Sequence, residues 1–275
     1  MKKIALTLLM VLMVFPGLFA QKKNPSLVLQ KGQVLTYKVT AGIDMTQSMM
    51  GQEMQSQITS TSIAVFNVED IWQEQYQIKQ TLKDVETHLK MQEMDTTFRL
   101  GEQSNFPILI VSKEGKVIAR QKKQAVEAKS GFSPDMAGNA SFLPFVEFPV
   151  YTVKEGESWI TEYIDTTGFS GGHLVNKVKT TYTFVGKDKK EGKKCLKVTY
   201  RSTVDNEGST SMQGMEFYIE GSGVMNGTQW IDVKTGIMVA DDALMESQMS
   251  LSLSGQQNFV IPMSMKTHIS RLLQQ

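Results

Sequence analysis

Residues 234–240, Lys-Thr-Gly-Ile-Met-Val-Ala, decide the fold because they repeat residues 113–119, Lys-Glu-Gly-Lys-Val-Ile-Ala, at an offset of 121 positions. In each copy a glycine follows two polar residues and comes just before a strand-like run. A three-residue hairpin turn places glycine where the backbone takes a positive φ angle. We therefore expect Gly115 and Gly236 to occupy equivalent turns between antiparallel strands.

Three further matches extend this repeat in the same order along the chain. They pair Met91–Met94 with Met212–Met215 and Met50–Gln52 with Gly171–His173 at an offset of 121, and Lys31–Gln33 with Glu155–Glu157 at an offset of 124. Solenoid and propeller repeats run to about 50 residues, so this period is too long for them. The matches predict a duplicated domain or half-domain.

The segments between the turns alternate apolar and polar residues, as strands with one buried and one solvated face do. The alternation is clearest in Val34–Val39, Thr180–Val185 and Met215–Ile219. The sequence therefore predicts an all-β fold of two sequence-related antiparallel meanders, over residues 21–120 and 155–275. Each meander either curls into a half-barrel sheet or pairs with the other into one larger sheet.

Residues 121–154 are predicted to join the two meanders. A short helix is expected over residues 119–129, ended by Gly131, and a stretch rich in proline, glycine and phenylalanine follows over residues 131–150. Four phenylalanines in a loop will not remain in water. They are expected to cover an open end of the sheet or to form the lid of a pocket.

The first 20 residues have the layout of a secretory signal peptide, with a basic start, an apolar run and a cleavage point after Ala20. The apolar run is shorter than the roughly 20 residues that span a bilayer, and no later segment reaches that length. Cleavage would remove Lys2 and Lys3 and change the net charge from +1 to −1. A balanced surface favours neither nucleic acid nor an anionic membrane as a partner.

Cys195 is the only cysteine, so no intramolecular disulfide can form. Exported eukaryotic proteins of this size usually carry several disulfides. The sequence therefore predicts a bacterial protein of the periplasm or the cell surface. Cys195 itself has a strand-like context and is expected to be a buried, unreactive thiol.

One catalytic motif occurs, but its surroundings argue against it. Gly168–Gly172 matches the G-x-S-x-G pattern of hydrolases, with Ser170 in the nucleophile position. His268, with Asp232 or Asp241, would complete a triad. The hydrolase elbow lies between a strand and a helix, whereas the residues after Gly172 form a strand-like pattern. The segment is therefore expected to be a hairpin turn.

No metal or cofactor is expected. The histidines at positions 88, 173 and 268 form no pair at metal-ligand spacing. The alternative is a copper site of thioether sulfurs at Met45, Met49 and Met54, which flank one turn. The second repeat keeps that turn without these methionines, and other methionines are spread along the chain.

Dispersed methionine indicates either a packed core or a surface that accepts apolar ligands. The predicted ligand-lining residues are methionines of one turn, two tryptophans and two phenylalanines of the joint: Met212, Met215, Trp159, Trp230, Phe142 and Phe145.

The signal peptide with its Ala20–Gln21 junction, the strand-to-turn element Trp230–Gly236 and the helix-bearing break in the sheet carry a resemblance. The chain resembles uncharacterised secreted β-proteins of Bacteroidota and is distantly similar to periplasmic lipoprotein carriers of the LolA/LolB type. This resemblance implies an open half-barrel. We expect a non-catalytic envelope protein that binds an apolar ligand or a lipidated partner. The alternatives are a structural or interaction module without a small-molecule ligand and, third, a hydrolase that uses Ser170.

Overall fold

The computed structural model describes residues 25–49, 51–104, 106–121, 143–169, 172–212, 215–253 and 259–274. In this part of the chain twelve strands form one sheet, and no helix occurs, so the prediction of an all-β fold is confirmed. The strands are β1 (Val34–Met49), β2 (Gln52–Trp72), β3 (Gln75–Met91), β4 (Met94–Leu100), β5 (Ile108–Ser112), β6 (Val117–Gln121), β7 (Ser158–Phe169), β8 (Gly172–Lys190), β9 (Lys193–Met212), β10 (Met215–Asp232), β11 (Met238–Leu253) and β12 (Phe259–Leu273).

The strands follow the order β6-β5-β3-β2-β1-β12-β11-β10-β9-β8-β7. β4 lies outside this order and pairs with the C-terminal half of β3, residues 85–91. All pairings are antiparallel. The pairing of β1 with β12 joins the two halves of the chain, from Tyr37 opposite Leu273 to Gln47 opposite Met263. The halves therefore form one larger sheet, which was one of the two expected arrangements, and the duplication itself stays a prediction.

The predicted helix over residues 119–129 is wrong at its start. Residues 119–121 belong to β6, and residues 122–129 lie outside the described residues. In β6, Arg120 pairs with Leu109 and Val117 pairs with Val111, and both β5 partners are buried. This ladder and its buried neighbours outweigh the helix propensity of the local sequence, because propensity is only a weak preference.

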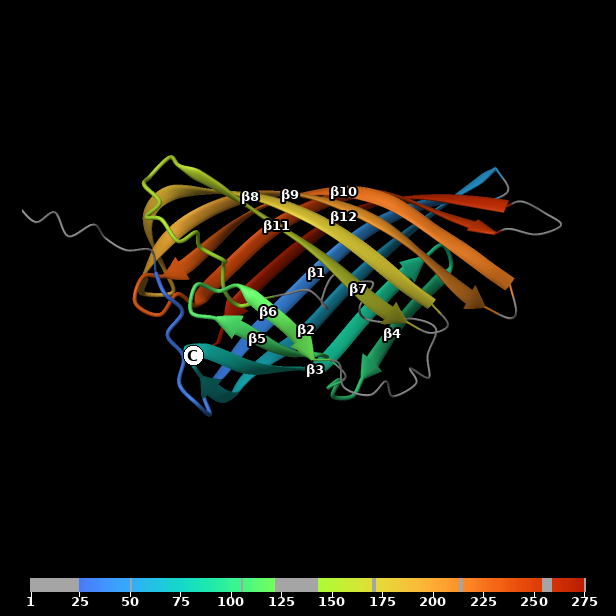
Figure 1. Cartoon of the computed structure of the whole chain (residues 1–275). Helices are drawn as coiled ribbons and strands as arrows, with labels where there is room; N and C mark the ends of the chain where they lie inside the picture. The colour runs from blue at the N-terminus through green and yellow to red at the C-terminus, as the bar shows by residue number, and fades with distance from the viewer. Residues whose placement is uncertain are drawn as a thin grey trace, which may run out of the picture.

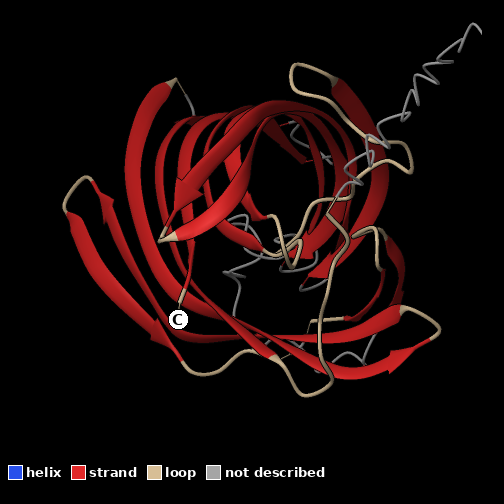
Figure 2. Cartoon of the chain, turned by 90° about the vertical axis from the view of Figure 1, so that its left-hand side faces the viewer, coloured by secondary structure: helices blue, strands red, loops and turns tan. Residues whose placement is uncertain are grey.

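The sheet is strongly curved, so its two faces differ (Figures 1 and 2). On β1 the odd-numbered positions from Leu35 to Ile43 are buried and face the inside of the curve. The even-numbered positions, such as Lys38 and Asp44, are exposed on the outside. The same alternation continues along β2 and β12. We call these surfaces the inner face and the outer face.

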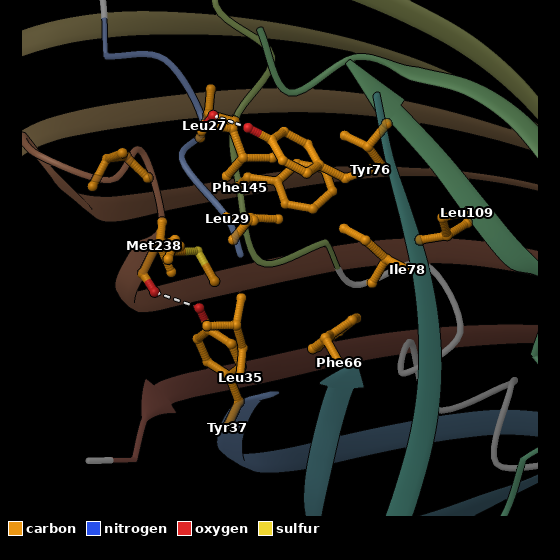
Figure 3. Packing of buried hydrophobic residues seen from close by; sticks show 14 of the residues in the cluster. Leu27, Leu29, Leu35, Tyr37, Phe66, Tyr76, Ile78, Leu109, Phe145 and Met238 are labelled. Atoms are coloured by element: carbon orange, nitrogen blue, oxygen red, sulfur yellow. Dashed lines mark hydrogen bonds between the residues drawn. The ribbon is translucent and has the colours of Figure 1, made fainter. Parts of the chain in front are cut away.

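The hydrophobic core lies at one end of the inner face, which we call the core end (Figure 1, left). Two segments outside the sheet cover it, with Leu27 and Leu29 from the first and Phe145 and Phe148 from the second. Figure 3 shows Leu27, Leu29 and Phe145 packed around the sheet residues. Phe145 and Phe148 therefore cover this end of the sheet, which confirms one of the two predictions for the joint.

Hydrogen bonds fix these covering segments and the strands beneath them. The hydroxyl of Tyr76 donates to the carbonyl of Leu27 at 2.7 Å, and the hydroxyl of Tyr37 donates to the carbonyl of Met238 at 2.6 Å (Figure 3). Both tyrosines are buried, so each pairing satisfies a polar group that would otherwise be costly to bury.

The two predicted glycine turns are confirmed. Gly115 has a φ of 84° and Gly236 a φ of 68°, each in a hairpin turn. Both turns also lie against other backbone. A Cβ added at Gly115 would come within 2.4 Å of the Val146 carbonyl oxygen, and one at Gly236 within 2.8 Å of the Ser26 carbonyl oxygen. Glycine is thus needed both for the φ angle and for the close approach.

Candidate functional site

Methionines gather on the inner face, away from the core end. They form three directly opposed cross-strand pairs, Met45 with Met265, Met263 with Met249, and Met245 with Met225. We call these six residues the methionine surface. Leucine and isoleucine extend it on both sides, at Leu89, Leu251 and Ile261 and at the buried pair Ile43 and Ile58.

The methionine surface is only half-buried, unlike the core. Directly behind it, the outer face carries a polar row in which Asp44 pairs with Lys266 and Lys266 with Glu246. The Lys266 ammonium lies 3.8 Å from a Glu246 carboxylate oxygen. At this level the sheet therefore separates a charged row on the outer face from methionine side chains on the inner face, and the described residues leave the methionine surface partly uncovered.

Glycines of β10 shape the methionine surface. Gly221 and Gly223 face inward opposite Met249 and Ser247. A Cβ at Gly221 would lie 2.6 Å from Cγ of Met249, and one at Gly223 would lie 2.9 Å from Cε of Met245. Methionine side chains therefore lie over the positions where β10 has none. Because methionine is unbranched and flexible, this covering can rearrange around an apolar molecule.

A group of polar side chains lies between the core and the methionine surface. Arg271 and Asp241 are directly opposed on β12 and β11, and both side chains are buried in a hydrogen-bonded ion pair. The Tyr200 hydroxyl donates to the other Asp241 carboxylate oxygen at 3.2 Å. Gln229, opposite Asp241 on β10, completes this group. We call these four residues the polar belt.

Burial governs the electrostatics of the polar belt. Desolvation raises the pKa of Asp241 above its usual range, although the Arg271 charge and the hydrogen bonds from Arg271 and Tyr200 oppose the rise. Desolvation also raises the pKa of Tyr200 well above its ordinary value. The belt is therefore a neutral group of paired charges and dipoles in a poorly hydrated interior.

The structure does not gather the ligand-lining residues predicted from the sequence into one surface. Trp159 is buried in the core, stacked between Phe148 and Tyr182 at centroid distances of 5.3 Å. Phe145 is also in the core. Trp230 comes directly after the inward-facing Gln229, so it lies on the outer face. Its indole Nε1 donates a hydrogen bond to the Asp188 carboxylate, and the Lys190 ammonium lies 4.5 Å from the centroid of its ring.

The remaining three predicted lining residues lie at strand ends or outside the described residues. Met212 and Met215 are the end residues of β9 and β10, where only the backbone is described, and Phe142 lies outside the described residues.

The sequence carries a signal for the methionine surface, which is the even spacing of its methionines along each strand. Met245 and Met249, like Met263 and Met265, are separated by an even number of positions and so share one face of a strand.

The catalytic and metal candidates are scattered as well. Ser170 lies outside the described residues, but β7 and β8 on either side of it are antiparallel partners, so no helix follows the motif within the described residues. The ring of His268 lies 3.3 Å from a carboxylate oxygen of Asp242, on the exposed outer face. Among the described residues, no cluster of histidine, cysteine and carboxylate groups could hold a metal ion.

Cys195 is a free, fully buried thiol. Burial raises its pKa, so the reactive thiolate is disfavoured. The expectation of a buried cysteine is confirmed.

Two open hollows, of about 600 and 630 Å³, lie on the outer face. Short polar and charged side chains line them, among them Asp44 and Lys266 in the first and Arg201 and Asp242 in the second. Many of these groups already have partners, as in the hydrogen bond from Arg201 to Asn226. The apolar surface on the inner face is therefore the stronger candidate site.

No helix among the described residues is long and apolar enough to cross a membrane.

No family model matches the chain, and no curated protein matches it. The chain is similar in structure to lipovitellin, from a study of its lipid–protein interactions, with a TM-score of 0.39 and 13% identity over 90% of this chain. It spans only 26% of that lipovitellin chain.

Two further solved structures match with lower TM-scores. OccK5 of Pseudomonas aeruginosa has a TM-score of 0.28 and 6% identity, over 88% of this chain and 99% of its own. An outer membrane channel of Pseudomonas putida F1 has a TM-score of 0.26 and 7% identity, over 90% and 98%. TM-scores this low assign no function, and the resemblance to lipoprotein carriers stays a prediction.

Proposed function

We propose that this protein binds an apolar molecule, such as the acyl chain of a lipid or of a lipidated partner, against its methionine surface. The observation that carries the proposal is the half-buried row of three cross-strand methionine pairs on the inner face of a sheet whose outer face is charged. Removing apolar surface from water contributes about 25 cal/mol per Å². An acyl chain on this surface would supply the covering that the described residues do not.

The proposed role is non-catalytic and lies in the bacterial envelope. The signal-peptide pattern of residues 1–20 supports export, and the fully buried Cys195 fits a chain that needs no disulfide. A protein that carries acyl chains through water needs a polar outside and an apolar inside. The alternation of charged outer residues with apolar inner residues supplies both.

The second candidate is an interaction module, and one observation favours it. β7 stands at the end of the strand order, and its Ile160 and Ile164 side chains are 57% and 70% exposed on the outer face. An edge strand with exposed apolar residues is a template for pairing with another chain. Such a module would bind its partner through the β7 edge, and substitutions in the methionine surface would not change that binding.

A titration separates these two functions. A fluorescent fatty-alcohol analogue, which is uncharged, should bind wild-type protein saturably, and Met249→Asp should weaken binding about tenfold or more because it places a charge on the apolar surface. The matched control is Gln248→Asp, which adds the same charge to the neighbouring outer-face position and should leave binding unchanged. Absence of saturable binding to wild type, or equal loss in both variants, would contradict the proposal.

A further inference from the structure

A second charged pair lies on the inner face, where the two edges of the sheet approach one another. β6 and β7 are the first and last strands of the order, yet the Nε atom of Arg120 on β6 lies 3.7 Å from Oδ1 of Asp165 on β7. We call these two residues the seam pair. A bulge between β5 and β6 turns Arg120 inward, because it lets Val117 and Arg120 both pair with inward-facing residues of β5.

The seam pair is held more loosely than the ion pair of the polar belt. Arg271 and Asp241 have side-chain exposures of 8% and 0% and share a hydrogen bond. Arg120 and Asp165 have exposures of 24% and 16%, and the 3.7 Å that separates them is longer than a hydrogen bond. The guanidinium and carboxylate groups of the seam pair therefore retain donors and acceptors for a further molecule.

The seam pair and the polar belt lie near each other. The positive charges of Arg120 and Arg271 both oppose the rise in pKa that burial imposes on Tyr163 of β7. Both guanidinium groups are thus within electrostatic reach of one phenol. Charges inside an apolar enclosure are costly, and a buried ion pair is often replaceable by apolar residues without loss of stability. Fold stability therefore gives no reason to prefer two ion pairs here over apolar residues.

A continuous row on the inner face leads from the seam pair to the methionine surface. The successive cross-strand partners from β7 to β11 are Asp165, Asn176, Asn206, Gly221 and Met249. Four strand spacings of about 4.8 Å place Met249 about 19 Å from Asp165 along the sheet. One leaflet of a bilayer core is about 15 Å thick, so an extended lipid chain fits this distance.

We propose that the seam pair binds the zwitterionic head group of an amphiphile whose acyl chain lies on the methionine surface, an inference that rests on the proposed function. An anionic oxygen of the head group would accept hydrogen bonds from Arg120, and its ammonium group would donate to Asp165. The buried Oδ1 of Asn206 has no hydrogen-bond partner among the described residues and offers a further acceptor in the same row.

Charge balance selects this class of head group. Arg120 and Asp165 sum to zero charge, as do Arg271 and Asp241. A head group with a net negative charge would leave one uncompensated charge in a poorly hydrated interior, which is far more costly than a balanced set. A zwitterion satisfies both members of the seam pair and keeps the interior neutral.

Calorimetric titration with single-chain ligands tests the proposal. Wild-type protein should bind a lysophosphatidylethanolamine about tenfold or more tightly than the fatty alcohol of equal chain length, since hydrogen bonds to charged groups are the stronger ones. It should also prefer this zwitterion to a lysophosphatidylglycerol of equal length. Arg120→Gln and Asp165→Asn should each bring the zwitterion-to-alcohol ratio close to one while leaving alcohol binding intact.

The matched control is Arg99→Gln, which removes an arginine from an exposed outer-face pair with Glu86 and should keep the wild-type ratio. Because the alcohol is measured on every variant, misfolding is separated from loss of head-group recognition. Equal wild-type affinity for zwitterion and alcohol, or preference for the anionic ligand, overturns this inference and leaves the proposed function standing. Absence of binding by all three ligands overturns the proposed function itself.

Discussion

The hydroxyl of Tyr37 donates a hydrogen bond to the backbone carbonyl of Met238, 201 positions further along the chain. This contact ties the start of β1 to the start of β11 within the core, and Tyr37 also meets the ring of Phe66 edge-on at 6.0 Å. Burial raises the pKa of Tyr37 well above its ordinary value, so the phenol stays protonated and remains a donor.

Removing that hydroxyl should therefore destabilise the fold. Tyr37→Phe keeps the ring packing but leaves the Met238 carbonyl without its donor, which should lower the free energy of unfolding by about 1–2 kcal/mol. Urea denaturation followed by circular dichroism measures the change. The control is Tyr218→Phe on the exposed outer face, expected to stay within about 0.5 kcal/mol of wild type. Equal midpoints for the two variants would argue against the bond.

The ion pair of the polar belt should be sensitive to loss of one partner. Arg271→Met leaves the Asp241 carboxylate buried without its cation, which should cost about 3–5 kcal/mol. The same substitution at Lys266, an exposed lysine on the same strand that pairs with Glu246, should cost less than about 1 kcal/mol. If both variants unfolded at the same urea concentration, the Arg271 pair would contribute no more than a surface pair.

The raised pKa of Asp241 predicts a specific pH dependence. A carboxyl group whose folded pKa exceeds its unfolded value binds its proton more tightly in the folded state. Its contribution to stability is therefore fully present below the unfolded pKa of about 3.9 and is lost as the pH rises through the folded pKa. Asp241→Asn removes this titration. The stability of wild type relative to Asp241→Asn should fall as the pH rises from 4 to 7 in urea unfolding experiments, and a flat or rising difference would contradict the prediction.

The two reasons for glycine at position 115 can be separated. Gly115→Ala adds a Cβ both at a positive φ angle and against the Val146 carbonyl, whereas Gly192→Ala adds one at a φ of 73° with open space around it. The second change should cost about 1 kcal/mol from backbone strain alone. The first should cost more, by about 1–3 kcal/mol. Equal denaturation midpoints for Gly115→Ala and Gly192→Ala would show that the added Cβ at position 115 does not clash with the Val146 carbonyl.

The strands and turns could be predicted from local patterns, because alternation and glycine turns are properties of neighbouring residues. Gly115, Gly236 and Cys195 behave as their surroundings in the sequence indicate. The pairing of β1 with β12 could not be predicted, since no local signal specifies which distant edge a strand will meet. The helix prediction failed at Ala119 because a ladder with β5 outweighs a weak propensity.

The candidate site was harder to predict than the fold. An aromatic residue at an inward position looks the same in sequence whether it packs into a core or contacts a ligand. The sequence therefore predicts Trp159 as a ligand contact, although Phe148 and Tyr182 stack on its two faces. The sequence does not predict the seam pair, because Arg120 and Asp165 meet only when the outermost strands of the sheet approach each other.

The pairing of β1 with β12 also determines when the sheet can be finished. On a growing chain, β1 and β2 emerge early, but the free side of β1 has no partner until residues 263–273 have been made. Contacts between residues so distant along the chain form slowly. The chain between them must first close into a long loop, at a cost in conformational entropy, before the contact stabilises the fold. During that interval the edge of β1 is exposed to other chains. β12 is thus the strand that covers this edge of β1, and deleting β12 should increase aggregation of the protein.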